Sequence, residues 1–263
     1  MTTGIAEKIN ILGRFCGKRD VEKLTVEELQ SRYGISRVDV MVLFGGSIIC
    51  GGDVLAHAME AGIAKKYIIV GGCGHTTETL RRLVHKAFPM ILTENLPEAE
   101  VFSRYIKTVY GLEVDYLETE STNCGNNITN MLELLKKNNI DFKSIILCQD
   151  ATMQHRMEAG LRKYVTNDIL IINYATYQAA VIDSDKELAY STDIYGMWDV
   201  DRYVTLLMGE IPRLTDDING YGPKGKDYIA HVEVPAEVNE AFLYLKGIYK
   251  DSVREANPLY ASK

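Results

Sequence analysis

The sequence lacks the features that define several classes of protein. Its five cysteines are widely spaced and include no CxxC pair, so neither a disulfide framework nor a zinc site is indicated. Positive charge is also scarce, because 36 acidic residues outnumber 29 basic residues and the formal net charge is -7. A nucleic-acid-binding protein needs a basic surface to displace counterions from phosphates, so no nucleic-acid partner is expected.

Long apolar segments are missing as well. Near the start of the chain, Glu7, Lys8 and Arg14 interrupt the apolar stretches, which is unlike the continuous apolar region of a signal peptide. No later segment reaches the length of a membrane span without charges. We therefore expect a cytoplasmic protein with no membrane partner. The five histidines lack the spacing of metal ligands, so no metal is expected either.

The sequence does contain an alternation of short apolar strands and amphipathic helices. Apolar, β-branched runs that are typical of buried parallel strands occur at 38–44, 67–70, 144–148 and 169–172. Helical spacing of apolar residues separates these runs, as at Leu55, Ala58 and Met59 after the first of them. The alternation predicts an α/β protein with a Rossmann-like, three-layer architecture, in which helices cover both faces of a parallel sheet.

This alternation fades after about Tyr177. Residues 177–196 resemble an irregular connection, 198–208 are expected to form a helix, and 211–227 have the Gly, Pro and Asp content of a long ordered loop. We expect a Rossmann-like domain over 36–176. Residues 1–35 together with 177–263 are expected to form a smaller helical lobe that packs on it.

Parallel sheets bind ligands beyond the carboxyl ends of their strands, where loops and helix N-termini present backbone amides. Gly45, Gly46 and Ser47 follow the first predicted strand, and glycine would let the backbone approach a ligand closely. The pattern is neither GxGxxG nor the phosphate-binding GxxxxGK[ST] loop. These glycines either contribute to a ligand site or simply turn the chain.

The loop 71–77 follows the second predicted strand and contains Gly72, Gly74 and His75. Cys73 beside His75 suggests a thiolate nucleophile, because a helix N-terminus lowers the pKa of a thiol. Adjacency on a loop does not establish a catalytic pair, however. We favour a small buried thiol next to a hydrogen-bonded histidine.

Two further loops precede predicted helices. The first holds more capping side chains than one N-cap needs, which favours a ligand; its candidate residues are Ser121, Thr122, Asn123, Gly125 and Asn127. The second contains Asp150, Thr152 and Arg156. Asp150 either accepts a hydrogen bond from a ribose hydroxyl, acts as a base, or caps the helix. Glu98, which follows Pro97, has the same alternatives as a ligand acceptor or a cap.

Four motifs resemble the YdcF-like branch of the bacterial SanA/YdcF family, long described as a domain of unknown function. They are GGCGHTT at 71–77, STNCGNN at 121–127, QDATMQHR at 149–156 and the segment 201–228. The resemblance implies a Rossmann-like domain with a helical lobe from both chain ends, and an S-adenosylmethionine-type ligand. It implies these ligand-binding residues: Gly45, Gly46, Gly72, Gly74, His75, Glu98, Ser121, Thr122, Asn123, Gly125, Asn127, Asp150, Thr152 and Arg156. It requires no thiol at Cys73.

The tail motif from Arg213 to Gly225 resembles the same branch. We expect either a lid, with Arg213, Lys224 or Lys226 reaching an anionic group, or an ordered loop buried against the sheet, and we favour the second interpretation.

Three functions are compatible with these residues. The first is a binding protein or transferase that uses S-adenosylmethionine or a related nucleotide-type compound. The second is a hydrolase or transferase for a phosphorylated or glycosylated envelope precursor, with Asp150 or His75 as base and Arg156 steadying the anion. The third is a regulatory module without chemistry. The sequence leaves open whether the protein is an enzyme. It also leaves open the oligomeric state, for which a homodimer is one alternative.

Overall fold

The computed structural model describes residues 3–46, 48–184 and 187–249, so Ser47 lies outside the described residues. Within these ranges, five parallel strands form the central sheet in the order β3-β2-β1-β4-β5. Their bounds are β1 Val38–Phe44, β2 Ala64–Val70, β3 Tyr116–Glu118, β4 Ser144–Cys148 and β5 Leu170–Asn173. Val42 of β1 pairs with Ile68 on one side and with Leu147 on the other. The expected α/β, Rossmann-like fold is confirmed.

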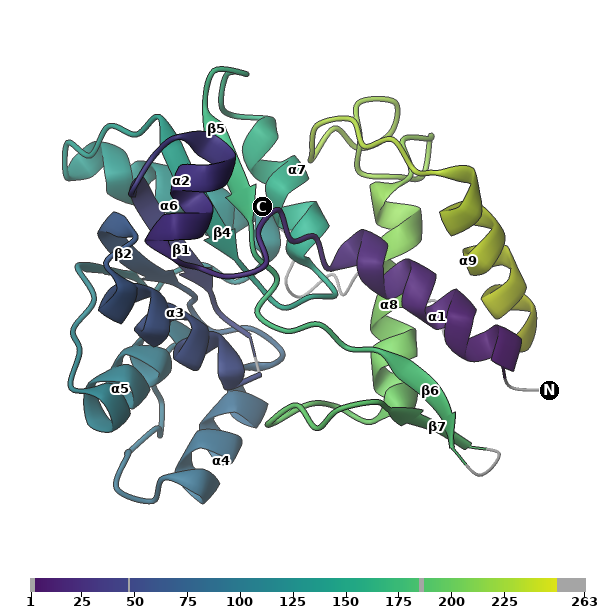
Figure 1. Cartoon of the computed structure of the whole chain (residues 1–263), viewed down its shortest axis with the longest axis horizontal. Coiled ribbons are helices and arrows are strands. Elements are labelled where there is room, and N and C mark those ends of the chain that lie inside the picture. Colours follow the sequence, from purple (N-terminus) through teal and green to yellow (C-terminus); the bar gives the residue numbers. More distant parts are fainter. Residues whose placement is uncertain (1–2, 47, 185–186, 250–263) are drawn as a thin grey trace.

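Helices cover both faces of this sheet (Figure 1). They are α2 Val26–Tyr33, α3 Cys50–Ala61, α4 Thr77–Ala87, α5 Glu98–Tyr110, α6 Cys124–Lys137 and α7 Gln154–Arg162. Met41 and Leu43 of β1 pack in the core that contains α3 and α5, whereas Val40 and Val42 pack in the core that contains α6 and α7. Because both faces are buried, the strand is apolar except for Asp39 near its start.

The remaining helices lie together beside the sheet, at the right of Figure 1. They are α1 Thr3–Cys16, α8 Val200–Leu214 and α9 Ala236–Ile248. Their shared core includes Ile9 of α1, Leu207 of α8 and Leu245 of α9. Segments from both ends of the chain thus pack together. Leu29 of α2, by contrast, belongs to the core on the sheet, so the first 35 residues contribute to both parts of the molecule.

One part of the lobe differs from the prediction. The connection after Tyr177 contains an antiparallel pair, β6 Val181–Ser184 and β7 Glu187–Tyr190, where we expected irregular structure. The side chain of Asn10 on α1 holds β6 by bonding both the N–H (2.7 Å) and the C=O (2.8 Å) of Val181. The pair was not predicted because Asn10 lies far from Val181 in the sequence. In addition, a four-residue strand shows too little alternation of apolar and polar residues to be recognised.

No helix in the described ranges combines the length and apolar character that crossing a membrane requires.

Candidate functional site

The structure brings the predicted loops together along the carboxyl edge of the sheet. The N–H of Gly45 donates to the C=O of Val70 at 2.7 Å, and the N–H of Gly71 donates to the C=O of Glu118 at 2.9 Å. On the other side of β1, the N–H of Thr176 donates to the C=O of Gln149 at 2.9 Å. These bonds join the loops after β1, β2 and β3, and separately the loops after β4 and β5; the two groups meet where Gly46 and Gln149 line one cavity, so the loops form a rim along the sheet edge.

Glycine is required in this rim because loops pack against one another. A Cβ at Gly45 would collide with the carboxylate of Glu98, and a Cβ at Gly72 would collide with the carbonyl oxygen of Ser121. Packing alone therefore accounts for these two glycines. Gly46 is different, because the nearest atom to a Cβ there would be Gln149 Oε1 at 3.7 Å, and Gly46 lines a cavity.

Glu98 holds the loop 71–77 against the start of α5. Its Oε1 accepts hydrogen bonds from the hydroxyls of Thr76 and Thr77, each at 2.9 Å, and its backbone N–H donates to Gly72. Burial raises the pKa of this carboxyl. The sequence suggested a ligand acceptor or a cap for Glu98, and the observed contacts show a third role, in which its carboxylate joins the loop 71–77 to the start of α5.

The third loop is organised by Glu118, which sequence reasoning missed. Its Oε1 accepts from the N–H groups of Glu120 and Ser121 and from the side chain of Asn130. Asn123 then caps α6 by accepting from the N–H of Asn126 at 2.9 Å. Ser121 Oγ accepts from the N–H of Gly72 at 3.2 Å, which joins this loop to the second. Thr122 and Gly125 are exposed, and Asn127 is half-buried in the first turn of α6.

The two carboxylate oxygens of Asp150 have different environments. Oδ1 accepts from the N–H (2.8 Å) and hydroxyl (2.6 Å) of Thr152 and from the hydroxyl of Tyr177 (2.9 Å). The bond to the N–H two residues onward forms an Asx turn, whereas the N-cap of α7 is Met153 and has no side-chain cap. Oδ2 is buried and has no hydrogen-bond partner among the described residues. The turn thus uses one oxygen and leaves the other available.

The neighbouring Gln149 also presents a polar atom without a partner. Its Oε1 accepts from the N–H of Asp150 at 2.6 Å, which fixes the orientation of the amide because only the oxygen can accept. The Nε2 donor is buried and has no partner in the part of the chain that the structure describes. Gln149 belongs to the predicted loop 149–156, but no pattern assigned it a role, because an amide after a strand has many ordinary roles.

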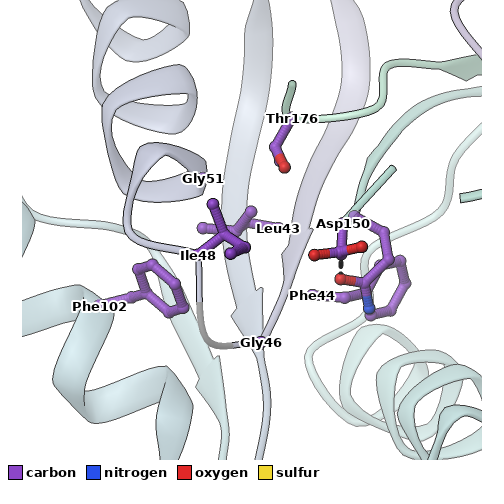
Figure 2. Close-up of a pocket in the computed structure, with 9 residues that line it drawn as sticks. Leu43, Phe44, Gly46, Ile48, Gly51, Phe102, Asp150 and Thr176 are labelled. Atoms are coloured by element: carbon purple, nitrogen blue, oxygen red, sulfur yellow. Dashed lines mark hydrogen bonds between the residues drawn. The ribbon is translucent and has the colours of Figure 1, made fainter. Parts of the chain in front are cut away.

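Gln149 and Asp150 line the same cavity between the ends of β1 and β4 (Figure 2). Its volume is about 10 Å³, at the lower limit for one water molecule. The remaining walls are mostly apolar; the other lining residues are Leu43, Phe44, Gly46, Ile48, Gly51, Phe102 and Thr176. The polar side chains that meet a group in this cavity are therefore those of Gln149, Asp150 and Thr176.

The cavity environment changes the acidity of Asp150. Only 4% of this residue is exposed, and burial raises the pKa of its carboxyl to about 6, although the bonds from Thr152 and Tyr177 oppose the rise. The carboxylate is consequently ionised above about pH 6, where Oδ2 acts only as an acceptor.

Arg156 and His75 are the other two candidates for chemistry. Arg156 is already paired, and His75 lies apart from Asp150. Arg156 forms a two-pronged ion pair with Glu210 of α8, at 2.5 and 3.0 Å. His75 is exposed on the loop after β2, and β1 separates that loop from β4, which places the two strands roughly 10 Å apart. His75 and Asp150 are thus candidates on different loops rather than a hydrogen-bonded pair.

Cys73 is exposed, so the prediction of a buried thiol is wrong. Its Sγ lies 3.5 Å from Nη2 of Arg81. The loop is held by the hydroxyl of Thr77, which accepts from the N–H of Gly74 and donates to Glu98.

The tail is a compact loop that folds on itself. Asp216 accepts from the N–H of Lys224 at 2.8 Å and contacts His231, while a Cβ at Gly220 would collide with the carbonyl oxygen of Thr215. The N–H of Ala230 donates to Ala159 of α7. These contacts agree with an ordered loop, which packs on α7 rather than on the sheet.

No group of three or more His, Cys, Asp or Glu side chains in the described residues is placed to hold a metal ion. No protein-family model matches the chain. The resemblance to the YdcF-like branch therefore stays a prediction.

Proposed function

We propose that this protein binds a nucleotide-type small molecule, with S-adenosylmethionine as the first candidate, across the carboxyl ends of β1 and β4. The observation that carries the proposal is that Gln149 and Asp150 line one cavity and that each has a buried atom, Nε2 and Oδ2 respectively, with no hydrogen-bond partner among the described residues. Leaving such atoms unpaired costs about 1–3 kcal/mol each, so their retention favours a ligand that pairs them.

The position of these atoms supports the same proposal. The chain runs outward from β1 to β2 and β3 on one side, then returns to β4 and β5 on the other. The reversal point between β1 and β4 is where open parallel sheets bind ligands. Gln149 and Asp150 follow β4 directly, and Gly46 faces them from the end of β1.

The size of the cavity limits what enters it. A volume of about 10 Å³ admits one small group and not a whole nucleotide. The body of the ligand would then lie outside the cavity, over the rim formed by the loop 71–77 and the start of α6. Asn123, Thr122 and His75 of the predicted set are on this rim.

Binding of a nucleotide-type ligand fits the structure better than the second function, which is hydrolysis or transfer on an envelope precursor. The second function assigns Arg156 to the anion, whereas Glu210 already engages that guanidinium through two hydrogen bonds. The first function needs no free cation, because backbone amides and neutral side chains suffice.

Titration calorimetry with S-adenosylmethionine, S-adenosylhomocysteine and adenine nucleotides tests the proposal. We expect at least one of these compounds to bind, and the Asp150→Asn variant to bind it roughly tenfold or more weakly, because Asn places a donor where Oδ2 accepts. The matched control is Asp141→Asn, an exposed aspartate at the opposite edge of the sheet, which should bind like the parent. Absence of binding by every compound would overturn the proposal.

A further inference from the structure

The chemistry of the cavity defines the group that fits it. Gln149 Nε2 can only donate, and the ionised Asp150 Oδ2 can only accept. A complementary group must therefore accept one hydrogen bond and donate another. An ammonium group has no acceptor for Gln149, and a carboxylate or phosphate has no donor for Asp150 and is repelled by it.

The volume of the cavity further limits which chemical group can fit in it. A carboxamide both donates and accepts, but it needs more room than the 10 Å³ or so that the cavity provides. A hydroxyl has a single heavy atom and matches one water molecule in size and in hydrogen bonding. The apolar walls formed by Leu43, Ile48 and Phe102 exclude competing partners and strengthen hydrogen bonds to such a group.

Neighbouring residues hold the two atoms in place. Three donors from Thr152 and Tyr177 fix Oδ1 of Asp150, and the N–H of Asp150 fixes Oε1 of Gln149. Each side chain thus uses one polar atom for its own positioning, and the other has no hydrogen-bond partner among the described residues.

We propose that Gln149 and Asp150 form a subsite for one hydroxyl group of the bound small molecule. The inference rests on the proposed function and adds to it a requirement for a hydroxyl-bearing ligand. It also assigns Gln149 as a specificity-determining residue.

Matched compounds that differ by one hydroxyl test this inference. The probes are S-adenosylhomocysteine and adenosine 5′-monophosphate, each compared by calorimetry with its 2′-deoxy and 3′-deoxy forms. We expect one of the two deoxy forms to bind the parent protein roughly ten- to hundredfold more weakly, because it loses a charge-assisted hydrogen bond to Asp150.

The same comparison in two variants locates the effect. Asp150→Asn replaces the acceptor by a donor, and Gln149→Glu replaces the donor by an acceptor while keeping the oxygen that bonds the N–H of Asp150. In either variant the preference for the hydroxyl should shrink to about twofold or less, as in a double-mutant cycle. Asp141→Asn should keep the full preference. Thermal unfolding of each variant establishes that it is folded. If only one of the two variants folds, that variant alone is sufficient to locate the effect.

Three results would overturn the subsite. If both deoxy forms bind the parent protein as tightly as the hydroxylated compounds, only water occupies the cavity, and the proposed function survives without the subsite. If the preference persists undiminished in the folded variants, the hydroxyl is recognised elsewhere. If no probe binds the parent protein at all, the proposed function fails and the subsite fails with it.

Discussion

The buried carboxylate of Asp150 is proposed to bind the ligand, but its burial lowers the stability of the folded protein when it is ionised. Burial disfavours its carboxylate, so the pKa in the folded protein is about 6, against an ordinary value of 3.8. Because the folded value is the higher one, the folded state is favoured while the group is protonated. This contribution is complete below about pH 4 and is lost as the pH rises through 6.

Asp150→Asn should therefore stabilise the protein at pH 8, although it weakens ligand binding. A shift of about two pKa units corresponds to on the order of 3 kcal/mol, which is an upper limit because Asn also makes weaker bonds to Thr152 and Tyr177. Urea unfolding at pH 4 and pH 8 measures the effect. The gain should be largest at pH 8 and should vanish near pH 4. A variant less stable than the parent at pH 8, with an unchanged Asp141→Asn control, would contradict this account.

The site residues differ in how far the sequence predicts them. Asp150 was recognisable, because an aspartate between a strand and a helix has few roles, although its two oxygens could not be assigned separately. Gln149 was missed, since the orientation of its amide depends on the backbone N–H of Asp150. For Gly45 and Gly72, the neighbours that exclude a Cβ are Glu98 and Ser121, which lie far away along the chain. Contacts of this kind leave no local pattern.

A buried ion pair connects the sheet-covering helix α7 to α8 of the helical lobe. Arg156 bonds both carboxylate oxygens of Glu210, and Arg213 of α8 contacts the same carboxylate at 3.3 Å. Glu210 is 4% exposed, so its charge is balanced by these guanidinium groups rather than by water. Breaking one member of such a cluster leaves uncompensated buried charge.

Glu210→Gln should destabilise the protein by about 3–5 kcal/mol, because the amide removes the charge that balances Arg156 and Arg213. Urea unfolding at pH 7 measures the loss. The control is Glu133→Gln on the exposed side of α6, which should change the free energy of unfolding by less than about 0.5 kcal/mol. A loss below about 1 kcal/mol for Glu210→Gln would show that the cluster contributes little to joining the two parts.

The elements were predictable where apolar patterning is long. The runs at 38–44 and 144–148 coincide with β1 and β4, whereas the three-residue β3 was missed. The predicted helix 198–208 continues to Leu214 through Pro212, although we expected a loop from 211. Ile211 and Leu214 are buried in the lobe core, and their packing offsets the hydrogen bond that proline removes. Tertiary packing of this kind is not visible in a local window.

At the scale of the whole molecule, two of the hollows in its described part lie at opposite edges of the sheet. The cavity at the carboxyl edge measures about 10 Å³, whereas an open groove of about 770 Å³ lies near the other edge, beside residues such as Leu135, Phe142 and Tyr164. Size alone favours the groove. However, the unpartnered buried side-chain atoms found in the described residues belong to Glu118, Gln149, Asp150 and Asp183, and none of these lines the groove. Polar chemistry therefore favours the carboxyl edge.

Amide hydrogen exchange with and without a saturating adenosine compound tests this choice most directly. The account predicts slower exchange on binding in 71–77, 121–127 and 149–156, with no change in 136–143 or 164–169. Protection confined to 136–143 and 164–169 would place the ligand in the groove and contradict the account.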